Sequence, residues 1–411
     1  MHFSTLLLTL VGLTVASPSS LSPRGARVAS GYVPTGNVTL FTPPASWASH
    51  IALYGRTVVL NQHCETNNVV LATWSQVAPN KTYAPIWKSN DLGKTWSELS
   101  RVYFHLADYD LIAHLALFET AEDYGKFPAG TVLLAGSAWK SNQPVVIELH
   151  ASRDKGKTWE YVSTPAVGSI IHRDAALEPL LYAHDGKLGL FYSDSRYPEV
   201  SSQTLSHQTS TDLVNWSSVV IDAINPNNGT RPGMVTIAQM GNGKFIFAYE
   251  LWAAPAFPTV NVPVHYRVGD SPFEMNREKE TPVVAGSGAD RQVGNAGPQI
   301  VWTPAGGVNG TIVMSESGNG GLLFINNAYG HPDAWKTIES GLPHGYTRTL
   351  QILPGTEGKV VLGFTGGSFP VDSPGQSIRS GTFVLPGPGS KKDGPGYSNC
   401  LPQKSSKKHS Q

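Results

Sequence analysis

Short apolar segments alternate with glycine-containing turns along most of this chain. Six stretches share one plan, in which a strand-like run, a tight turn and a second strand-like run follow one another. These stretches span residues 56–76, 114–139, 178–194, 234–252, 298–317 and 348–366. Five turns carry a glycine, namely Gly130, Gly186, Gly243, Gly310 and Gly358, at intervals of 48 to 67 residues. A four-stranded blade with its loops needs about this length, so the pattern predicts an all-β propeller.

Two of the repeats carry turn dipeptides of a defined type. Asp185-Gly186 and Asn242-Gly243 each separate two apolar runs. Both central residues of a type I′ turn need a positive φ, so we expect type I′ hairpins at both places. In an antiparallel hairpin the start of the first strand and the end of the second lie at the same end.

A second motif repeats out of phase with the first. Residues 89–96 (SNDLGKTW) and 152–159 (SRDKGKTW) both read S-x-D-x-G-x-T-W, and residues 210–216 (STDLVNW) are a degraded copy. This is the Asp-box turn, in which the aspartate accepts backbone N–H bonds, the glycine takes a left-handed conformation and the tryptophan is buried between strands. We expect each copy to fix a hairpin in the outer part of a blade, with no catalytic role.

The last repeat lacks one strand. After residues 358–366 the chain offers one more good strand candidate, near residues 380–385, and residues 37–41 (NVTLF) could supply the missing one. Pairing the two ends of the chain would close the ring and remove an exposed sheet edge. We therefore predict a six-bladed β-propeller with Asp-box turns over residues 36–387; a solenoid and two packed sandwiches are the alternatives.

The two ends of the chain predict secretion. Residues 1–16 combine an apolar core with a small-residue cleavage site and read as a signal peptide. Residues 17–35 are rich in Ser and Pro and predict a flexible lead or pro-segment, and residues 388–411 predict a disordered tail. Glycosylation sequons begin at Asn37, Asn80, Asn215, Asn228 and Asn309 and agree with an extracellular, glycosylated protein. Cys64 and Cys400 could form a disulfide or remain free thiols.

Composition narrows the choice of partner. Charged residues are only 15% of the 411 residues, and the formal net charge is +0. A nucleic-acid partner would require a basic surface, so this balance argues against one and suits an uncharged substrate. No stretch after the signal is long enough to span a bilayer, so we expect no membrane partner, and we expect a monomer.

Glu178 and Glu250 are the candidate catalytic residues. Glu178 begins the first strand of its hairpin, Glu250 ends the second strand of the next, and both have apolar neighbours. Burial of a carboxylate is costly and tends to raise its pKa. Retaining glycosidases need one carboxylate as nucleophile and one as acid/base, about 5 to 5.5 Å apart. The alternative is a pair of structural glutamates bonded to backbone or to arginine.

The signal, the Asp boxes, the six repeats and this glutamate pair together resemble the fungal exo-arabinanases of glycoside hydrolase family 93, over nearly all of the mature chain. The resemblance implies a six-bladed propeller that cleaves α-1,5-linked arabinan of plant cell walls from the non-reducing end and releases arabinobiose with retention. The family's two catalytic glutamates are 72 residues apart, as Glu178 and Glu250 are. Carried over, Glu178 would be the nucleophile and Glu250 the acid/base, and no metal or organic cofactor is required.

An exo-acting enzyme also needs residues that hold the sugar and a wall that blocks the chain. Polar and aromatic residues at strand ends are the candidates. The candidate substrate-binding residues are Arg56, His172, Arg173, Asp194, Arg231, Trp252 and Tyr346. Trp252 and Tyr346 could stack on sugar faces, the arginines could bond hydroxyls, and the loops at 172–174 and after Trp252 could form the wall. For each of these residues, packing or ion pairing is the alternative role.

Two other functions remain open on the sequence. A sialidase shares the propeller and the Asp boxes but needs an arginine triad and a tyrosine nucleophile, for which Arg56, Arg231, Arg291 or Arg348 and Tyr346 leave room. Arg56 is, however, followed by Thr-Val-Val and not by the Ile-Pro seen in sialidases. The other possibility is a secreted carbohydrate-binding propeller without catalysis, although a lectin has no use for two buried acids.

Overall fold

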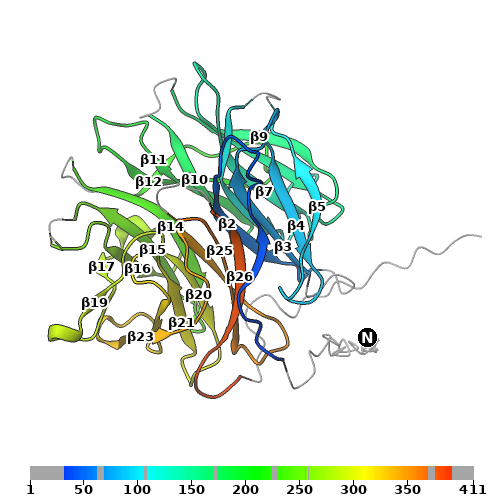
Figure 1. Cartoon of the computed structure of the whole chain (residues 1–411). Coiled ribbons are helices and arrows are strands. Elements are labelled where there is room, and N and C mark those ends of the chain that lie inside the picture. Colours follow the sequence, from blue (N-terminus) through cyan, green and yellow to red (C-terminus); the bar gives the residue numbers. More distant parts are fainter. Residues whose placement is uncertain are drawn as a thin grey trace, which may run out of the picture.

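The chain folds almost entirely into antiparallel strands arranged as a propeller (Figure 1). The structure is a computed structural model that describes residues 32–62, 69–105, 109–169, 174–224, 229–254, 256–257, 259–368 and 375–390. In these ranges the helices are the short 3₁₀ turns η1 (Met275–Arg277), η2 (Gly288–Asp290) and η3 (Pro332–Ala334). None of the helices in the described ranges is long and apolar enough to cross a membrane. The predicted all-β propeller class is confirmed.

The strands follow the chain as successive four-stranded antiparallel units. The first two units are β2 (Ala52–Val59), β3 (Val70–Gln76), β4 (Ala84–Ser89) and β5 (Ser97–Val102), then β6 (Leu111–Glu119), β7 (Val132–Trp139), β8 (Val146–Ser152) and β9 (Glu160–Val167). These two units are joined into one eight-stranded sheet by a single residue pair, Gln76 with Ile112. The next unit is β10 (Ala176–His184), β11 (Lys187–Asp194), β12 (Thr204–Ser210) and β13 (Val220–Ala223).

The second half of the chain continues the same plan. The fourth unit is the sheet of β14 (Arg231–Gln239), β15 (Phe245–Trp252), β16 (Val264–Gly269) and β17 (Thr281–Pro282). A small two-stranded sheet follows, made of β18 (Val284–Ala285) and β19 (Gln292–Val293). The next four-stranded sheet is β20 (Gln299–Thr303), β21 (Thr311–Ser315), β22 (Leu322–Asn326) and β23 (Trp335–Glu339). The last sheet contains β24 (Thr347–Ile352), β25 (Val360–Gly366), β26 (Ile378–Val384) and β1 (Val38–Phe41).

The first strands of the units form a closed cycle around the centre. Each strand in the order β2, β6, β10, β14, β20 and β24 contacts the next, and β24 contacts β2 again. The apolar core lies between neighbouring sheets, as where Leu133 and Leu149 from one unit pack with Leu181 and Leu190 from the next. Burial of such leucines on both faces of each sheet is the main stabilising term of the fold.

The ring closes through the two ends of the described chain. β1 pairs antiparallel with β26, with Val38 opposite Ser380, so a strand from the N-terminal end completes the last sheet. The prediction that residues 37–41 supply this strand is confirmed. The pairing covers what would otherwise be a free sheet edge.

The predicted turn glycines have the expected conformation, but one turn type was wrong. Gly130, Gly186, Gly243, Gly310 and Gly358 all have positive φ. Asp185 has φ 50° and Gly186 φ 69°, as a type I′ turn requires. At the second dipeptide only Gly243 has a positive φ. There the loop is longer: Met240 N–H donates to Lys244 O, and Gly243 N–H donates to Met240 O. This is a type I turn followed by a left-handed glycine, which does not need a positive φ at Asn242.

The Asp boxes fix the outer hairpins, as predicted. In the first copy, Asp91 Oδ1 accepts from Lys94 N (3.1 Å) and Thr95 N (2.9 Å), and Thr95 Oγ1 donates to Asp91 Oδ2 (2.6 Å). The copy at residues 152–159 repeats these bonds around Asp154. The degraded copy lacks one residue, and its Leu213 has φ 66°, the left-handed conformation that Leu92 and Lys155 have after the aspartate in the intact copies.

Each Asp-box tryptophan also ties its unit to the preceding one. Trp159 Nε1 donates to Ser100 Oγ at 3.1 Å, and Ser100 Oγ donates to Gly156 O at 2.5 Å. Trp96 makes the same contact with Ser380, and Trp216 makes it with Ser163. The three motifs therefore clip neighbouring sheets together at the outer rim.

Removal of one clip is expected to lower stability without altering the centre of the ring. Ser100→Ala removes both bonds made by the Ser100 hydroxyl and leaves Trp159 Nε1 bonded only to Gly156 O within its own turn, which should lower the free energy of unfolding by about 1 kcal/mol. Ser97→Ala, on the same strand but exposed, is the matched control and should change it by less than about 0.5 kcal/mol. Urea unfolding of the three proteins measures this. Equal midpoints for the two variants would contradict the clip.

Candidate active site

Four consecutive first strands carry the same distortion at the same place. β2, β6, β10 and β14 each have a bulge in their pairing near the start of the strand. Each bulge contains one non-glycine residue in the left-handed region: Tyr54 (φ 53°), His114 (φ 52°), Glu178 (φ 61°) and Met234 (φ 55°). Such residues are uncommon, and bulges often redirect a side chain beside an active site.

The four redirected side chains meet in the centre of the ring. The Tyr54 and His114 ring centroids are 4.5 Å apart. The Tyr54 hydroxyl donates to Glu178 Oε1 at 2.9 Å and lies 3.9 Å from Met234 Sδ. The repeated bulge therefore builds one cluster from four units.

Glu178 is held by three donors. Besides Tyr54, Ser193 Oγ donates to Glu178 Oε2 at 2.6 Å, and Met234 N–H donates to the same oxygen at 3.3 Å. Ser193 lies on β11 and Met234 on β14, so the carboxylate is fixed from the neighbouring strand, the next unit and β2. Both oxygens have a defined orientation before any substrate is bound.

Glu250 lies close to Glu178 but in a different environment. Its Oε2 accepts the Gly297 N–H at 2.7 Å. Burial, and then the negative charge of Glu178, raise the pKa of the Glu250 carboxyl to about 7, against the opposing effects of Gly297 and Arg231. The protonated carboxyl is therefore well populated near neutral pH, as a general acid requires.

A glycine allows the two acids to approach. Gly233 is the register partner of Glu250, at the bulge of β14. A Cβ on Gly233 would lie 3.6 Å from Glu178 Oε2 and only 2.9 Å from Gln203 Nε2. Because Gly233 has no side chain, the bulge packs directly against Glu178 and brings Glu250 to the same opening.

Two tyrosines complete the cluster. The Tyr54 and Tyr346 ring centroids are 5.3 Å apart, and the Tyr346 hydroxyl lies 3.8 Å from Met234 Sδ. Burial and the charges of Glu250 and Glu178 raise the pKa of the Tyr346 hydroxyl above its usual value. Burial and the charge of Glu178 raise the pKa of Tyr54 in the same way. Both hydroxyls therefore remain protonated donors at the edge of the acidic pair.

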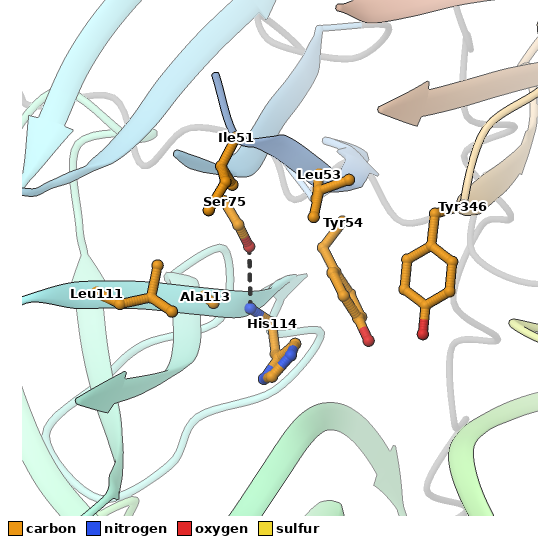
Figure 2. Close-up of a pocket in the computed structure, with 8 residues that line it drawn as sticks. All are labelled: Ile51, Leu53, Tyr54, Ser75, Leu111, Ala113, His114 and Tyr346. Atoms are coloured by element: carbon orange, nitrogen blue, oxygen red, sulfur yellow. Dashed lines mark hydrogen bonds between the residues drawn. The ribbon is translucent and has the colours of Figure 1, made fainter. Parts of the chain in front are cut away.

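A pocket of about 270 Å³ opens beside this cluster. Its lining is mostly apolar and consists of Ile51, Leu53, Tyr54, Ser75, Leu111, Ala113, His114 and Tyr346. Figure 2 shows the Tyr54 and Tyr346 hydroxyls pointing the same way, with the His114 ring beside Tyr54. The backbone N–H of His114 donates to Ser75 Oγ at 3.0 Å. Burial lowers the pKa of His114 to about 4, so the ring is neutral at working pH.

The structure distributes the predicted substrate-binding residues over different places. Tyr346 lies in the central cluster. Arg231 and Trp252 lie opposite each other at the strand ends, with the guanidinium 5.2 Å from the indole centroid and the Trp252 side chain 46% exposed. Arg231 and Tyr346 lie near enough to Glu250 to interact with its charge.

Two other predicted residues make hydrogen bonds with the protein itself. Arg56 Nη1 donates to Gly55 O and Thr347 Oγ1, and its guanidinium packs against the Tyr54 ring, so Arg56 supports Tyr54. Asp194 is fully buried, and both its oxygens accept bonds from the Arg196 side chain, which corrects the prediction that Asp194 contacts sugar.

Several predictions fall outside the described residues. These are the roles of His172 and Arg173 and the pairing of Cys64 with Cys400. Conversely, four residues that bond to the two acids were not predicted from the sequence, namely Tyr54, Ser193, Met234 and Gly297. Alignment of the repeats on Glu178 would have placed Tyr54, His114 and Met234 in one column. Among the described residues, no group of three or more His, Cys, Asp or Glu side chains could hold a metal ion.

Comparison with solved structures gives close matches over most of the chain. The α-L-arabinofuranosidase of Fusarium graminearum from glycoside hydrolase family 93, solved with arabinobiose, is 33% identical, with a TM-score of 0.79 over 85% of this chain and 98% of that one. Its structure with an iminosugar inhibitor matches at 34% identity with the same TM-score and coverage. An α-L-arabinanase of Penicillium chrysogenum, also solved with arabinobiose, is 34% identical, with a TM-score of 0.78 over 86% and 99%.

The chain belongs to glycoside hydrolase family 93. It is therefore a glycoside hydrolase, and the family resemblance found in the sequence is confirmed. Scans against protein-family models and curated proteins gave no match.

The raised pKa of Glu250 predicts a pH-dependent stability. From the unfolded value of 4.5 up to about 7, the folded chain binds more protons at Glu250 than the unfolded chain does. The free energy of unfolding therefore falls as pH rises through this window, by roughly 2 to 3 kcal/mol from this group. Glu250→Gln cannot ionise and should lose this fall, while other titrating groups cancel in the comparison. Urea unfolding of both proteins at pH 4.5 and pH 7 measures it, and parallel curves would contradict the raised pKa.

Proposed function

We propose that this protein is a secreted, retaining exo-arabinanase that cleaves α-1,5-linked L-arabinan from the non-reducing end and releases arabinobiose. The observation that carries the proposal is the pair of Glu178 and Glu250 at one opening of the ring, in a chain of family 93. Two relatives about one-third identical were solved with arabinobiose, which supports arabinan oligosaccharides as the substrate class.

We further propose that the ring has six blades. The eight-stranded sheet divides naturally into two blades, β2 to β5 and β6 to β9, because one residue pair joins them. The first strands of these two blades and of the remaining four-stranded sheets are the strands of the central cycle. Closure of the ring leaves no open side, which supports the expectation of a monomer.

The two acids have different roles in the proposed mechanism. Glu178, oriented by Tyr54, Ser193 and Met234, acts as nucleophile. Glu250 acts as acid/base because its raised pKa keeps a proton available near neutral pH. Such a division, with one carboxyl oriented and the other kept partly protonated, is typical of paired glycosidase carboxylates.

The reaction proceeds by two displacements. A Glu178 oxygen attacks the anomeric carbon while the Glu250 carboxyl gives its proton to the leaving glycosidic oxygen, so that the C–O bond breaks and a glycosyl ester forms. Glu250, now ionised, then takes a proton from water, whose oxygen attacks the same carbon and releases Glu178. Two inversions at one carbon give net retention.

The pocket and the rim account for the proposed exo action. The pocket beside Tyr54 and His114 lies next to Glu178 and would hold the sugar units that precede the cleaved bond. Trp252 presents an exposed ring at the rim, where a sugar face could stack, and Arg231 beside it offers donors for hydroxyls. The apolar end of the pocket, at Ile51 and Leu111, would stop the chain.

The sialidase alternative loses one of its candidate arginines. Arg348 is 1% exposed, and its side chain donates to Gly320 O and Leu322 O. The Arg348 guanidinium is therefore not placed to bind a substrate carboxylate. Secretion is proposed on the signal-like pattern of residues 1–16, which lie outside the described residues.

Product analysis on debranched linear arabinan tests the proposal. Arabinobiose should be the product from the earliest times, and added methanol should trap the intermediate as the α-configured methyl arabinobioside. Products of mixed length would contradict exo action, and a β-configured methyl glycoside would contradict retention. Secretion is tested by expression of the full chain in a fungal host, where the protein should accumulate in the medium.

Variants of the two acids test the roles. Glu178→Ala and Glu250→Ala should each lower turnover of arabinan by about 10²-fold or more, whereas Glu199→Ala, at an exposed carboxylate, should not. With an aryl arabinobioside and azide, Glu250→Ala should give the α-azide, because azide attacks the glycosyl ester, and Glu178→Ala the β-azide, because azide attacks the substrate. The reverse pattern would exchange the two roles.

A further inference from the structure

We propose that Glu316, a buried acid outside the central cluster, is a positioning residue that sets the hydrogen bond between Gly297 and Glu250. This inference rests on the proposed role of Glu250 as acid/base. The Gly297 N–H donates to Glu250 Oε2, and Gly297 lies in a loop and not in a strand, so the position of this donor depends on what holds the loop.

Glu316 is a buried acid whose oxygens are fully used. It directly follows β21 and is 1% exposed. Its Oε2 accepts from Asn295 N (3.1 Å), Gly318 N (2.9 Å) and Asn319 Nδ2 (3.0 Å), and its Oε1 accepts from Asn319 N (3.0 Å). A carboxylate is the side chain suited to this place, because it accepts at both oxygens and donates at neither when ionised.

These bonds join two loops. The loop at 316–319 follows β21, whereas Asn295 begins the loop that leads to Gly297. Further bonds reinforce the junction: Ser317 N–H donates to Ala296 O at 3.0 Å, and Gly318 N–H donates to Asn295 O at 2.9 Å. Glu316 is thus the side chain through which the loop at 316–319 holds the loop at 295–297.

The held loop has a strained and crowded conformation. Ala296 has φ 62° and Gly297 φ 51°, so two successive residues are left-handed, and one of them is not glycine. A Cβ on Gly297 would lie 2.7 Å from Ser317 Oγ and 2.8 Å from Tyr346 O. Such a conformation persists only where its surroundings impose it, and here the loop at 316–319 lies on one side and Tyr346 on the other.

Arg348 holds the residues that directly follow the loop at 316–319. It is 1% exposed, and its Nη2 donates to Leu322 O at 2.8 Å, while Ser315 Oγ donates to Arg348 O at 2.5 Å. Burial raises the pKa of Glu316, and the backbone N–H donors and the positive charge of Arg348 oppose that rise. Glu316 and Arg348 thus form a buried, oppositely charged support beneath the donor to Glu250.

The consequence for catalysis concerns both the position and the acidity of Glu250. The charged and titratable groups around Glu250 are Glu178 on β10, Arg231 on β14, Tyr54 on β2 and Tyr346 before β24. None of these changes when Glu316 is replaced. If the loop at 295–297 relaxes, Glu250 loses a donor that favours its ionised form, so its pKa rises and its carboxyl is less well aligned.

The pH profile of kcat/KM tests the inference. Glu316→Gln keeps the shape of the side chain but points an amide group at N–H donors. It should lower kcat on arabinan by on the order of tenfold with a smaller change in KM, and should move the basic limb of the profile upward by about one pH unit. Asn319→Ala, which removes only the bond to Oε2 and one to Val293 O, should produce a smaller shift in the same direction.

Glu339→Gln is the matched control, since Glu339 lies in the same sheet but is exposed. It should leave both kcat and the profile unchanged. If Glu316→Gln and Asn319→Ala both remain folded and lower kcat without moving the basic limb, Glu316 is merely structural and the inference is overturned. If the Glu250 variants themselves retain full activity, the proposed function fails instead, so the two failures are distinguishable.

Discussion

The site depends on one backbone distortion that is repeated in four neighbouring units. A regular strand alternates its side chains between the two faces of a sheet, so both faces go into the core between blades and little is left to point along the axis. A bulge with one left-handed residue breaks this alternation near the start of β2, β6, β10 and β14. Tyr54, His114, Glu178 and Met234 are the side chains that it turns to the centre. The closed ring of strands thus forms the walls of the site, and the bulges direct these four side chains into it.

This arrangement places two carboxyl groups where both cannot easily be charged. Burial alone disfavours the anion of Glu250, and the neighbouring charge of Glu178 disfavours it further. The surroundings resolve the conflict unequally. Glu178 receives donors from Tyr54, Ser193 and the Met234 backbone, whereas Glu250 receives one backbone N–H from Gly297. Both acids are glutamates, so it is the difference in their hydrogen-bond donors that separates the roles that we propose for them.

The sequence predicted what depends on local pattern and missed what depends on backbone irregularity. The propeller class, the Asp boxes and the closing strand follow from spacing and turn chemistry, whereas the choice of Glu178 and Glu250 as the acid pair came from their apolar neighbours and the family resemblance. The type of turn at Asn242 was wrong because loop length, and not the dipeptide, decided it. Asp194 was misjudged because its ion pair with Arg196, two residues further along the chain, is not evident from its position at the end of a strand. Tyr54 and Met234 were missed because a strand pattern gives no sign of a left-handed residue. Gly297 was missed because it lies in a loop that is not part of the repeated strand pattern.

The central claim is that the two acids share one electrostatic environment, with the charge of Glu178 helping to hold the proton on Glu250. The direct measurement is the pKa of Glu250 from ¹³C-detected carboxyl titration, in the wild type and in Glu178→Gln, with the signal assigned by its loss in Glu250→Gln. The account predicts a wild-type value of about 7 that falls clearly when the charge at residue 178 is removed, because only burial then raises it. A value near 4.5 in the wild type, or one that does not change in Glu178→Gln, would contradict it.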